Sequence, residues 1–246
     1  MKDLKFDINE FFDKEKIEEN ELDKKRIKEN CEFLKSQNIE VLENMLLVPR
    51  NFDTFLRSEK YYIAGMLREY LFAVVSASMT GDLENDEKNF CEILDRLIKK
   101  YHINEIITKE EYQFLCDMSE GKVTPEIMAQ ASWKYEKVAV YLSMLGLSDI
   151  YELGKVCDAK LIDNYFMFNN NVSLQSLFEN AKLKPKEEIL KQADLVFRCK
   201  WASEQANIDG KCFHMDELVL NEQKKAFSTL LNWDDKMLRR TQVSEK

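Results

Sequence analysis

The sequence predicts an all-α protein: one globular domain of roughly eight or nine helices, with a charged N-terminal arm. The 246 residues include only 6 Gly and 3 Pro, too few for the many tight turns of a β-sandwich or barrel. The hydrophobic fraction of 45% supplies enough apolar side chains for a packed core. Apolar residues also recur at intervals of three and four in several long segments, which is the period of an amphipathic helix.

The N-terminal region differs from the rest in composition. Residues 1–25 are dense in Lys, Asp and Glu, so we expect a loosely held arm, and we expect proteases to cleave first within residues 1–20. A short helix follows, on which Ile27, Cys31 and Leu34 form one apolar stripe. We expect the all-helical domain over residues 26–241 and a polar tail at 242–246, since no linker rich in Pro, Gly or Ser divides the chain.

Capping signals place the next three helices. The first long helix is expected from about Ser58, a plausible N-cap, to Met79, and the second starts near Asp86. A third opens at Thr108, where Glu111 stands at the spacing of a capping box and can accept a hydrogen bond from the Thr108 amide.

The segment from 126 to 145 predicts a central helix. Thr124-Pro125-Glu126 is a helix start, and Gly146 suits the left-handed position after its end. Apolar side chains cover most of its circumference, which is typical of a helix in the middle of a bundle. Its narrow polar strip consists of Gln130, Lys134, Lys137 and Tyr141, and Glu136 projects away from that strip.

The remaining helices follow the same signals. Asp158 and Ser173 are expected to cap two short helices, and Lys184-Pro185 to open a long one that reaches about Ala206. A last helix runs from Asp216 to about Asn232.

Charge and cysteine usage limit the partners. The net charge of −9 argues against a nucleic-acid or anionic-membrane surface, because both need a basic field. The longest uncharged run, Tyr70 to Gly81, is too short to span a bilayer. The N-terminus does not resemble a signal peptide, and the six cysteines are scattered without a CxxC pair, so we expect reduced thiols and a cytoplasmic location.

Two glutamates fall on faces that should be buried. The side chain of Glu136 projects from its helix on the same side as Val140. Glu222 shares a helix face with Val219, Ala226, Leu230 and Trp233. A buried carboxylate must be paired, hydrogen-bonded or protonated. Arg68 and Arg198 are the candidate partners, and Arg198 also stands one turn after Asp194 in the favourable order for an ion pair.

These residues have two interpretations. They could line a polar pocket built around Trp133, Glu136, Arg198, Trp201 and Glu222, or they could form a salt-bridge network that holds the helices together. We favour the salt-bridge network over the polar pocket, because structural networks also place charged groups inside a protein. The candidate group comprises Arg68, Trp133, Tyr135, Glu136, Asp194, Arg198, Trp201, Glu222, Trp233, Asp234 and Asp235.

No motif points to a cofactor or a metal. The two histidines, His102 and His214, lack the Glu-x-x-His spacing of a di-iron bundle. Cys199, Cys212 and His214 match no standard zinc spacing, and Gly-rich phosphate loops are absent. We therefore predict no cofactor and no metal.

An ordered set of motifs resembles a bacterial family known as domain of unknown function 4272 (DUF4272). The matching elements are Arg57-Ser58 with Ile63-Ala64, Trp133-Lys134-Tyr135-Glu136 running to Leu145-Gly146, Cys157-Asp158, Arg198-Cys199-Lys200-Trp201-Ala202, and Trp233-Asp234-Asp235. They span roughly residues 30–241, with departures at Glu222-Gln223, Ala226–Thr229 and Arg240-Thr241. The resemblance implies a helical fold and no assigned reaction.

Two functional hypotheses remain open. The first is a non-catalytic cytoplasmic protein that binds another macromolecule, a protein partner in the first instance, with toxin-neutralising or stress-related roles in view. The alternative is an enzyme or small-ligand-binding protein that uses the pocket lined by Trp, Glu and Arg.

Overall fold

The computed structural model describes residues 21–43 and 57–231, and every regular element within these ranges is a helix. The predicted all-α class is therefore confirmed, and the described residues form one compact domain. The expectations for residues 1–20, for Trp233, Asp234 and Asp235 and for the tail at 242–246 lie outside the described ranges, whereas residues 21–25, the last part of the predicted arm, are helical. The helices are α1 Glu21–Ser36, α3 Glu59–Ser78, α4 Leu83–Tyr101, the 3₁₀ turn η2 Ile103–Glu105, α5 Lys109–Ser119, α6 Pro125–Ser132, α7 Lys134–Met144, α8 Ala159–Asp163, the π-helical turn η3 Asn164–Phe168, α9 Leu174–Asn180, α10 Lys186–Ile208 and α11 Glu217–Leu230.

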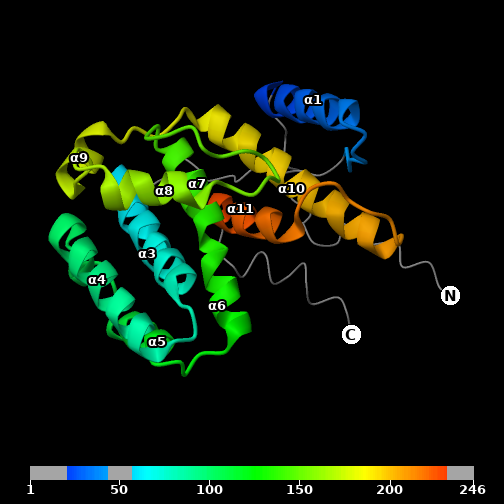
Figure 1. Cartoon of the computed structure of the whole chain (residues 1–246). Helices are drawn as coiled ribbons and strands as arrows, with labels where there is room; N and C mark the ends of the chain where they lie inside the picture. Colours follow the sequence, from blue (N-terminus) through cyan, green and yellow to red (C-terminus); the bar gives the residue numbers. More distant parts are fainter. Residues whose placement is uncertain (1–20, 44–56, 232–246) are drawn as a thin grey trace.

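The helices pack side by side in a sequence of neighbours (Figure 1). Helix α3 packs against α4 on one side and against α6 and α7 on the other. Helix α7 in turn contacts α11, α11 contacts α10, and α1 lies against α10 at the far end of the molecule. Elements from the first and last parts of the described chain thus meet at α10.

Helix α7 lies in the middle of this arrangement, as its nearly continuous apolar circumference predicts. All but two of its residues are buried, and they join the main hydrophobic core with α3. Tyr141, assigned by periodicity to the polar strip, is also buried, which corrects that part of the prediction. A smaller apolar cluster holds α1 to α10 and α11; its members are Leu34, Ile39, Leu195, Cys199, Ala202 and Leu220.

The predicted continuous helix over 126–145 is wrong in one respect, because it is interrupted at Trp133. Helix α6 ends at Ser132 and α7 begins at Lys134. The Ser132 hydroxyl donates to the carbonyl of Ala129 at 2.7 Å, the acceptor that the Trp133 amide would use in a continuous α-helix. Competition of this kind bends helices. Trp133 is therefore the junction residue between the two helices.

Most predicted caps are confirmed. Thr108 and Glu111 form the reciprocal capping box at the start of α5, and Thr124 caps α6 with Pro125 in its first turn. Gly146 follows α7 with φ +65°, a conformation that suits glycine. The start of α4 lies at Leu83 rather than near Asp86. Asp86 instead accepts hydrogen bonds from the amides of Thr80 (2.7 Å) and Gly81 (2.9 Å), which closes the turn before that helix.

Candidate functional site

The predicted Arg198–Asp194 pair is present and wholly buried. Arg198 Nε donates to Asp194 Oδ2 at 2.8 Å, and both side chains are 0% exposed. The same carboxylate oxygen accepts from Asn30 Nδ2 at 2.8 Å, and Arg198 donates to the carbonyl of Leu42. These contacts tie α10 to α1 and the residues after it. The pair therefore serves packing and does not face Glu136 or Glu222.

Arg68 is not the partner of a buried glutamate. Its guanidinium pairs with Glu111 on α5, with Nε 3.1 Å from Oε1, and its side chain is 43% exposed. The prediction that Arg68 or Arg198 neutralises Glu136 is wrong, because both guanidinium groups are held elsewhere.

Glu136 lies behind α7, away from the lysines of that helix. Its Oε1 accepts the backbone N–H of Cys157 at 2.8 Å, so the carboxylate is hydrogen-bonded, which is one of the three states expected for a buried acid. Oε2 is buried without a hydrogen-bond partner among the described residues. Burial raises the pKa of the Glu136 carboxyl, although the Cys157 amide opposes the shift. This glutamate is a buried acid without a cation beside it in the described part of the chain.

Tyr135 belongs to a further buried cluster that periodicity did not reveal. Its hydroxyl donates to Asp163 Oδ1 at 2.8 Å, and the Tyr70 hydroxyl donates to the same oxygen at 3.0 Å. Burial raises the pKa of the Asp163 carboxyl, and the two tyrosine hydrogen bonds counter that shift. Asp163 ends α8, a short helix whose length gave no usable pattern.

Trp201 and Trp133 lie in different places. Trp201 packs against the small cluster between α1, α10 and α11. Trp133 stands at the break between α6 and α7 and lines a groove that also contains Glu222. Of the five residues of the predicted pocket, Trp133 and Glu222 line this groove in the described part of the chain, whereas Glu136, Arg198 and Trp201 are not among its lining residues.

We call this groove, which contains the predicted residues Trp133 and Glu222, the α6–α11 groove. Its volume is about 770 Å³. It is bordered by α3, α5, α6, the start of α7 and α11. The lining residues are Phe72, Glu110, Glu111, Phe114, Ile127, Gln130, Ala131, Trp133, Lys134, Lys137, Leu218, Asn221, Glu222 and Lys225.

The apolar part of the groove combines one buried and one half-buried ring with exposed aliphatic side chains. Phe72 and Phe114 pack with their ring centroids 5.9 Å apart, and Lys134 Nζ lies 5.1 Å from the Phe72 centroid. Ile127 and Leu218 are 42% and 51% exposed although they occupy the first turns of α6 and α11. Large apolar side chains at such positions bury little surface within the protein.

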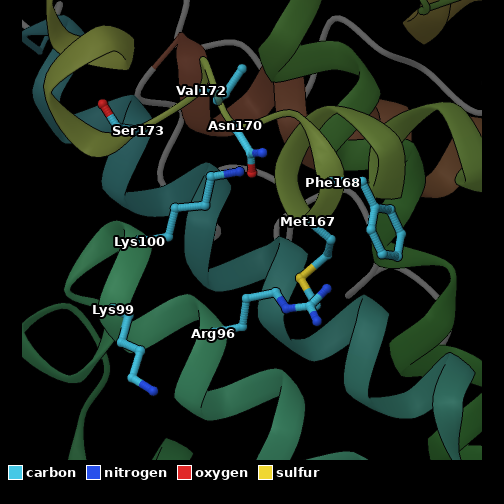
Figure 2. A pocket seen from close by; sticks show the side chains of 8 residues that line it. All are labelled: Arg96, Lys99, Lys100, Met167, Phe168, Asn170, Val172 and Ser173. Atoms are coloured by element: carbon cyan, nitrogen blue, oxygen red, sulfur yellow. The ribbon is translucent and has the colours of Figure 1, made fainter.

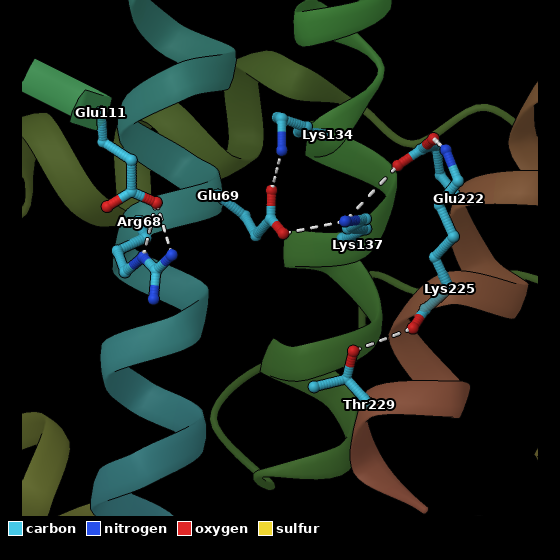
Figure 3. Close-up of polar contacts among 8 residues, drawn as sticks. All are labelled: Arg68, Glu69, Glu111, Lys134, Lys137, Glu222, Lys225 and Thr229. Atoms are coloured by element: carbon cyan, nitrogen blue, oxygen red, sulfur yellow. Dashed lines mark hydrogen bonds and ion pairs between the residues drawn. The ribbon is translucent and has the colours of Figure 1, made fainter. Parts of the chain in front are cut away.

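A row of alternating charges crosses the groove from α3 to α11 (Figure 3). Lys134 and Lys137 both pair with Glu69, the latter at 2.8 Å, and Lys137 also lies 3.9 Å from Glu222. Glu222 then pairs with Lys225. The predicted burial of Glu222 is confirmed at 8% exposure, but lysines replace the expected arginine.

Glu69 is the centre of this row. Burial by itself would raise the pKa of the Glu69 carboxyl, but the ammonium groups of Lys137 and Lys134 outweigh burial and hold that pKa below its ordinary value. The carboxylate is therefore ionised at neutral pH and fixes both lysines. The sequence analysis did not single out Glu69, because it follows Arg68 on α3 and the two together read as an ordinary polar position of that helix. Exposed Ile127 and Leu218, just after helix caps, were the available signal for the groove.

The described residues contain no group of three or more His, Cys, Asp or Glu side chains arranged to hold a metal ion. Within the same ranges, no helix is both long enough and apolar enough to cross a bilayer. The groove thus offers apolar contact area and paired charges as its chemistry.

Comparison with known proteins identifies a family. The family model for the domain of unknown function DUF4272 matches residues 25–236. No curated protein and no solved structure matches the chain. The family match covers most of the sequence, including the break at Trp133 and the groove. The chain therefore belongs to the DUF4272 family.

Proposed function

We propose that this protein acts by binding an amphipathic helical segment of a protein partner in the α6–α11 groove, without catalysing a reaction. The observation that carries the proposal is the composition of the groove: Trp133, Ile127 and Leu218 present apolar surface next to a row of paired charges. Protein interfaces have such apolar centres with aromatic anchors and polar rims.

The paired charges favour a protein partner over a small ligand. Small-ligand sites use a few convergent polar groups to orient the ligand. Here Lys134, Lys137 and Lys225 are already occupied by Glu69 and Glu222. Charges held in this way give a rim that selects partners through electrostatic complementarity.

The form of the partner segment follows from the walls of the groove. Each wall is helical, so no strand edge is available to extend with an added strand. A groove between helices suits an amphipathic helix, whose apolar residues at every third or fourth position would contact Trp133, Ile127 and Leu218. Flanking charges of both signs on that helix would face Lys225 and Glu110.

We place this activity in the bacterial cytoplasm. The resemblance to a bacterial family and the six free cysteines, two of them exposed, support that location. A toxin-neutralising or stress-related role would be one form of the proposed binding, with the toxin or effector as the owner of the helical segment.

Site-directed photo-crosslinking in cells tests the proposal. A benzophenone amino acid at position 127 should give a discrete protein adduct, which Leu218→Glu should abolish. Leu161 is the matched control, since it is 52% exposed against 51% for Leu218 but lies on α8 outside the groove. Leu161→Glu should leave the adduct unchanged.

The alternative, an enzyme or small-ligand-binding protein, predicts a different result at the same position. A small molecule that co-purifies with the wild type and is lost from Leu218→Glu, without a protein adduct, would replace the proposal with that alternative. An adduct that is insensitive to Leu218→Glu would also overturn it.

A further inference from the structure

A second hollow lies between the end of α4 and the segment that contains η3. Its volume is about 580 Å³, and Arg96, Lys99, Lys100, Met167, Phe168 and Asn170 line it together with Val172 and Ser173. Figure 2 shows Arg96 and Lys100 reaching towards the 167–173 segment, whereas Lys99 points away from it. Lys99 pairs instead with Asp95 at 2.6 Å.

Arg96 and Lys100 are held without carboxylates. Within residues 21–43 and 57–231, neither cation forms an ion pair; Arg96 lies 5.5 Å from the Phe168 ring centroid. Lys100 Nζ donates to the carbonyls of Phe166 and Asn169, both at 2.7 Å, which leaves one of its three N–H groups for another acceptor. Burial, and then the charge of Arg96, lower the pKa of Lys100.

Two positive charges one helical turn apart repel each other, and an anion between them would offset that repulsion. The C-terminal end of a helix favours cations, which accounts for their position in the last turns of α4. It does not account for a hollow in front of them. In a protein of net charge −9, surface carboxylates are plentiful, yet none of those described is paired with these two groups.

The other wall of the hollow is apolar. Phe168 is 62% exposed at the end of the π-helical turn η3, and the half-buried Met167 and the buried Val172 also line this wall. Single π-helical turns occur often at functional sites. A hollow of this volume is within the range that holds a small organic molecule.

We propose that this hollow binds a small organic phosphate. The phosphate oxygens would accept hydrogen bonds from the guanidinium of Arg96 and from the free N–H of Lys100. The organic part would pack against Phe168 and Met167. A dianionic phosphate matches two cations, whereas a single carboxylate would neutralise one of them. The planar guanidinium also fits phosphate oxygens through two parallel hydrogen bonds. This site is separate from the α6–α11 groove.

Backbone NMR titration of the full chain tests the proposal with three probes at constant ionic strength: inorganic phosphate, phenyl phosphate and benzoate. Saturable shifts of residues 96–100 and 166–173 are expected with both phosphates. Burial of the phenyl ring should make phenyl phosphate about tenfold tighter than inorganic phosphate. Benzoate should bind more weakly than phenyl phosphate.

Three variants give the controls. Arg96→Gln preserves the Lys100 hydrogen bonds and should weaken both phosphates at least about tenfold. Phe168→Ala should weaken phenyl phosphate alone. Lys88→Gln removes the same charge from an exposed position on the same helix and should change neither affinity. Shifts that do not saturate, that respond equally to Lys88→Gln, or that favour benzoate would overturn the proposal.

Discussion

The carboxylate of Glu136 accepts the backbone N–H of Cys157 at 2.8 Å and has no lysine or arginine as an ion-pair partner among the described residues. Glu136 is 2% exposed, and its other oxygen lacks a hydrogen bond. The charges of Asp216 and Glu222 act on it, and both add to the effect of burial in raising its pKa. A salt-bridge network therefore does not explain this residue.

Replacing Glu136 by Gln should preserve or increase stability at neutral pH. The folded-state pKa is raised, so the folded protein binds the proton more tightly than the unfolded chain, and stability falls as pH rises from the unfolded pKa through the folded one. A tenfold difference in proton affinity between the two states corresponds to about 1.4 kcal/mol. Urea unfolding should be measured at pH 4 and pH 7.5. The free energy of unfolding of the Gln variant, relative to that of the wild type, should be higher at pH 7.5 than at pH 4.

The control for this measurement is Glu105→Gln, an exposed glutamate. It should change the free energy of unfolding little, and by the same amount at both pH values. A Glu136→Gln variant that is less stable than the wild type at pH 7.5 would contradict this prediction.

Glu69→Gln should have the opposite pH dependence. Its folded-state pKa lies below the ordinary value, so the stabilisation is present above the unfolded pKa and is lost as pH falls through the folded pKa. At pH 7 we expect a loss of about 1–3 kcal/mol, because Lys134 and Lys137 lose their shared acceptor. Unfolding curves that keep this loss undiminished at pH 2.5 would contradict the assignment.

Replacing only one residue of the buried Asp194–Arg198 pair should lower the free energy of unfolding strongly. Asp194→Asn leaves the Arg198 guanidinium buried without its counter-ion and should cost about 3 kcal/mol. Replacing both residues, with Arg198→Met and Asp194→Leu, should recover part of that loss. A double-mutant cycle measures the coupling. Additive losses would mean that the two side chains stabilise the fold independently.

Ser132→Ala should restore the helical hydrogen bond that the Ser132 hydroxyl displaces. The Trp133 amide could then donate to Ala129, and its hydrogen exchange should slow. Ser36→Ala is the matched control, because the Ser36 hydroxyl makes the same kind of contact with the carbonyl of Phe33 at the end of α1. Unchanged exchange at Trp133 would show that the break has another cause.

Local chemistry determined much of this protein from its sequence. The scarcity of Gly and Pro, the helical period of apolar residues and the caps at Thr108, Thr124 and Ser173 predicted the class and most helix boundaries, because those signals act within a few residues of the chain. The Asp194–Arg198 pair was predictable for the same reason, since its partners are one turn apart.

Contacts between distant elements were decided only by the tertiary structure. The helical period of the apolar residues shows that Glu136 and Glu222 face the interior. It does not identify the residues on other helices that contact them. The packing of α7 against α3 and α11 brings Lys137 to Glu69 and Glu222, and a loop amide of Cys157 to Glu136. The groove combines Trp133, which lies at the break between α6 and α7, with Leu218 of α11, and only the docking of α11 brings these two residues to one groove. Such pairings depend on how the helices are placed relative to one another. The apolar pattern of a single helix shows which of its faces is buried, but it does not determine which helix packs there.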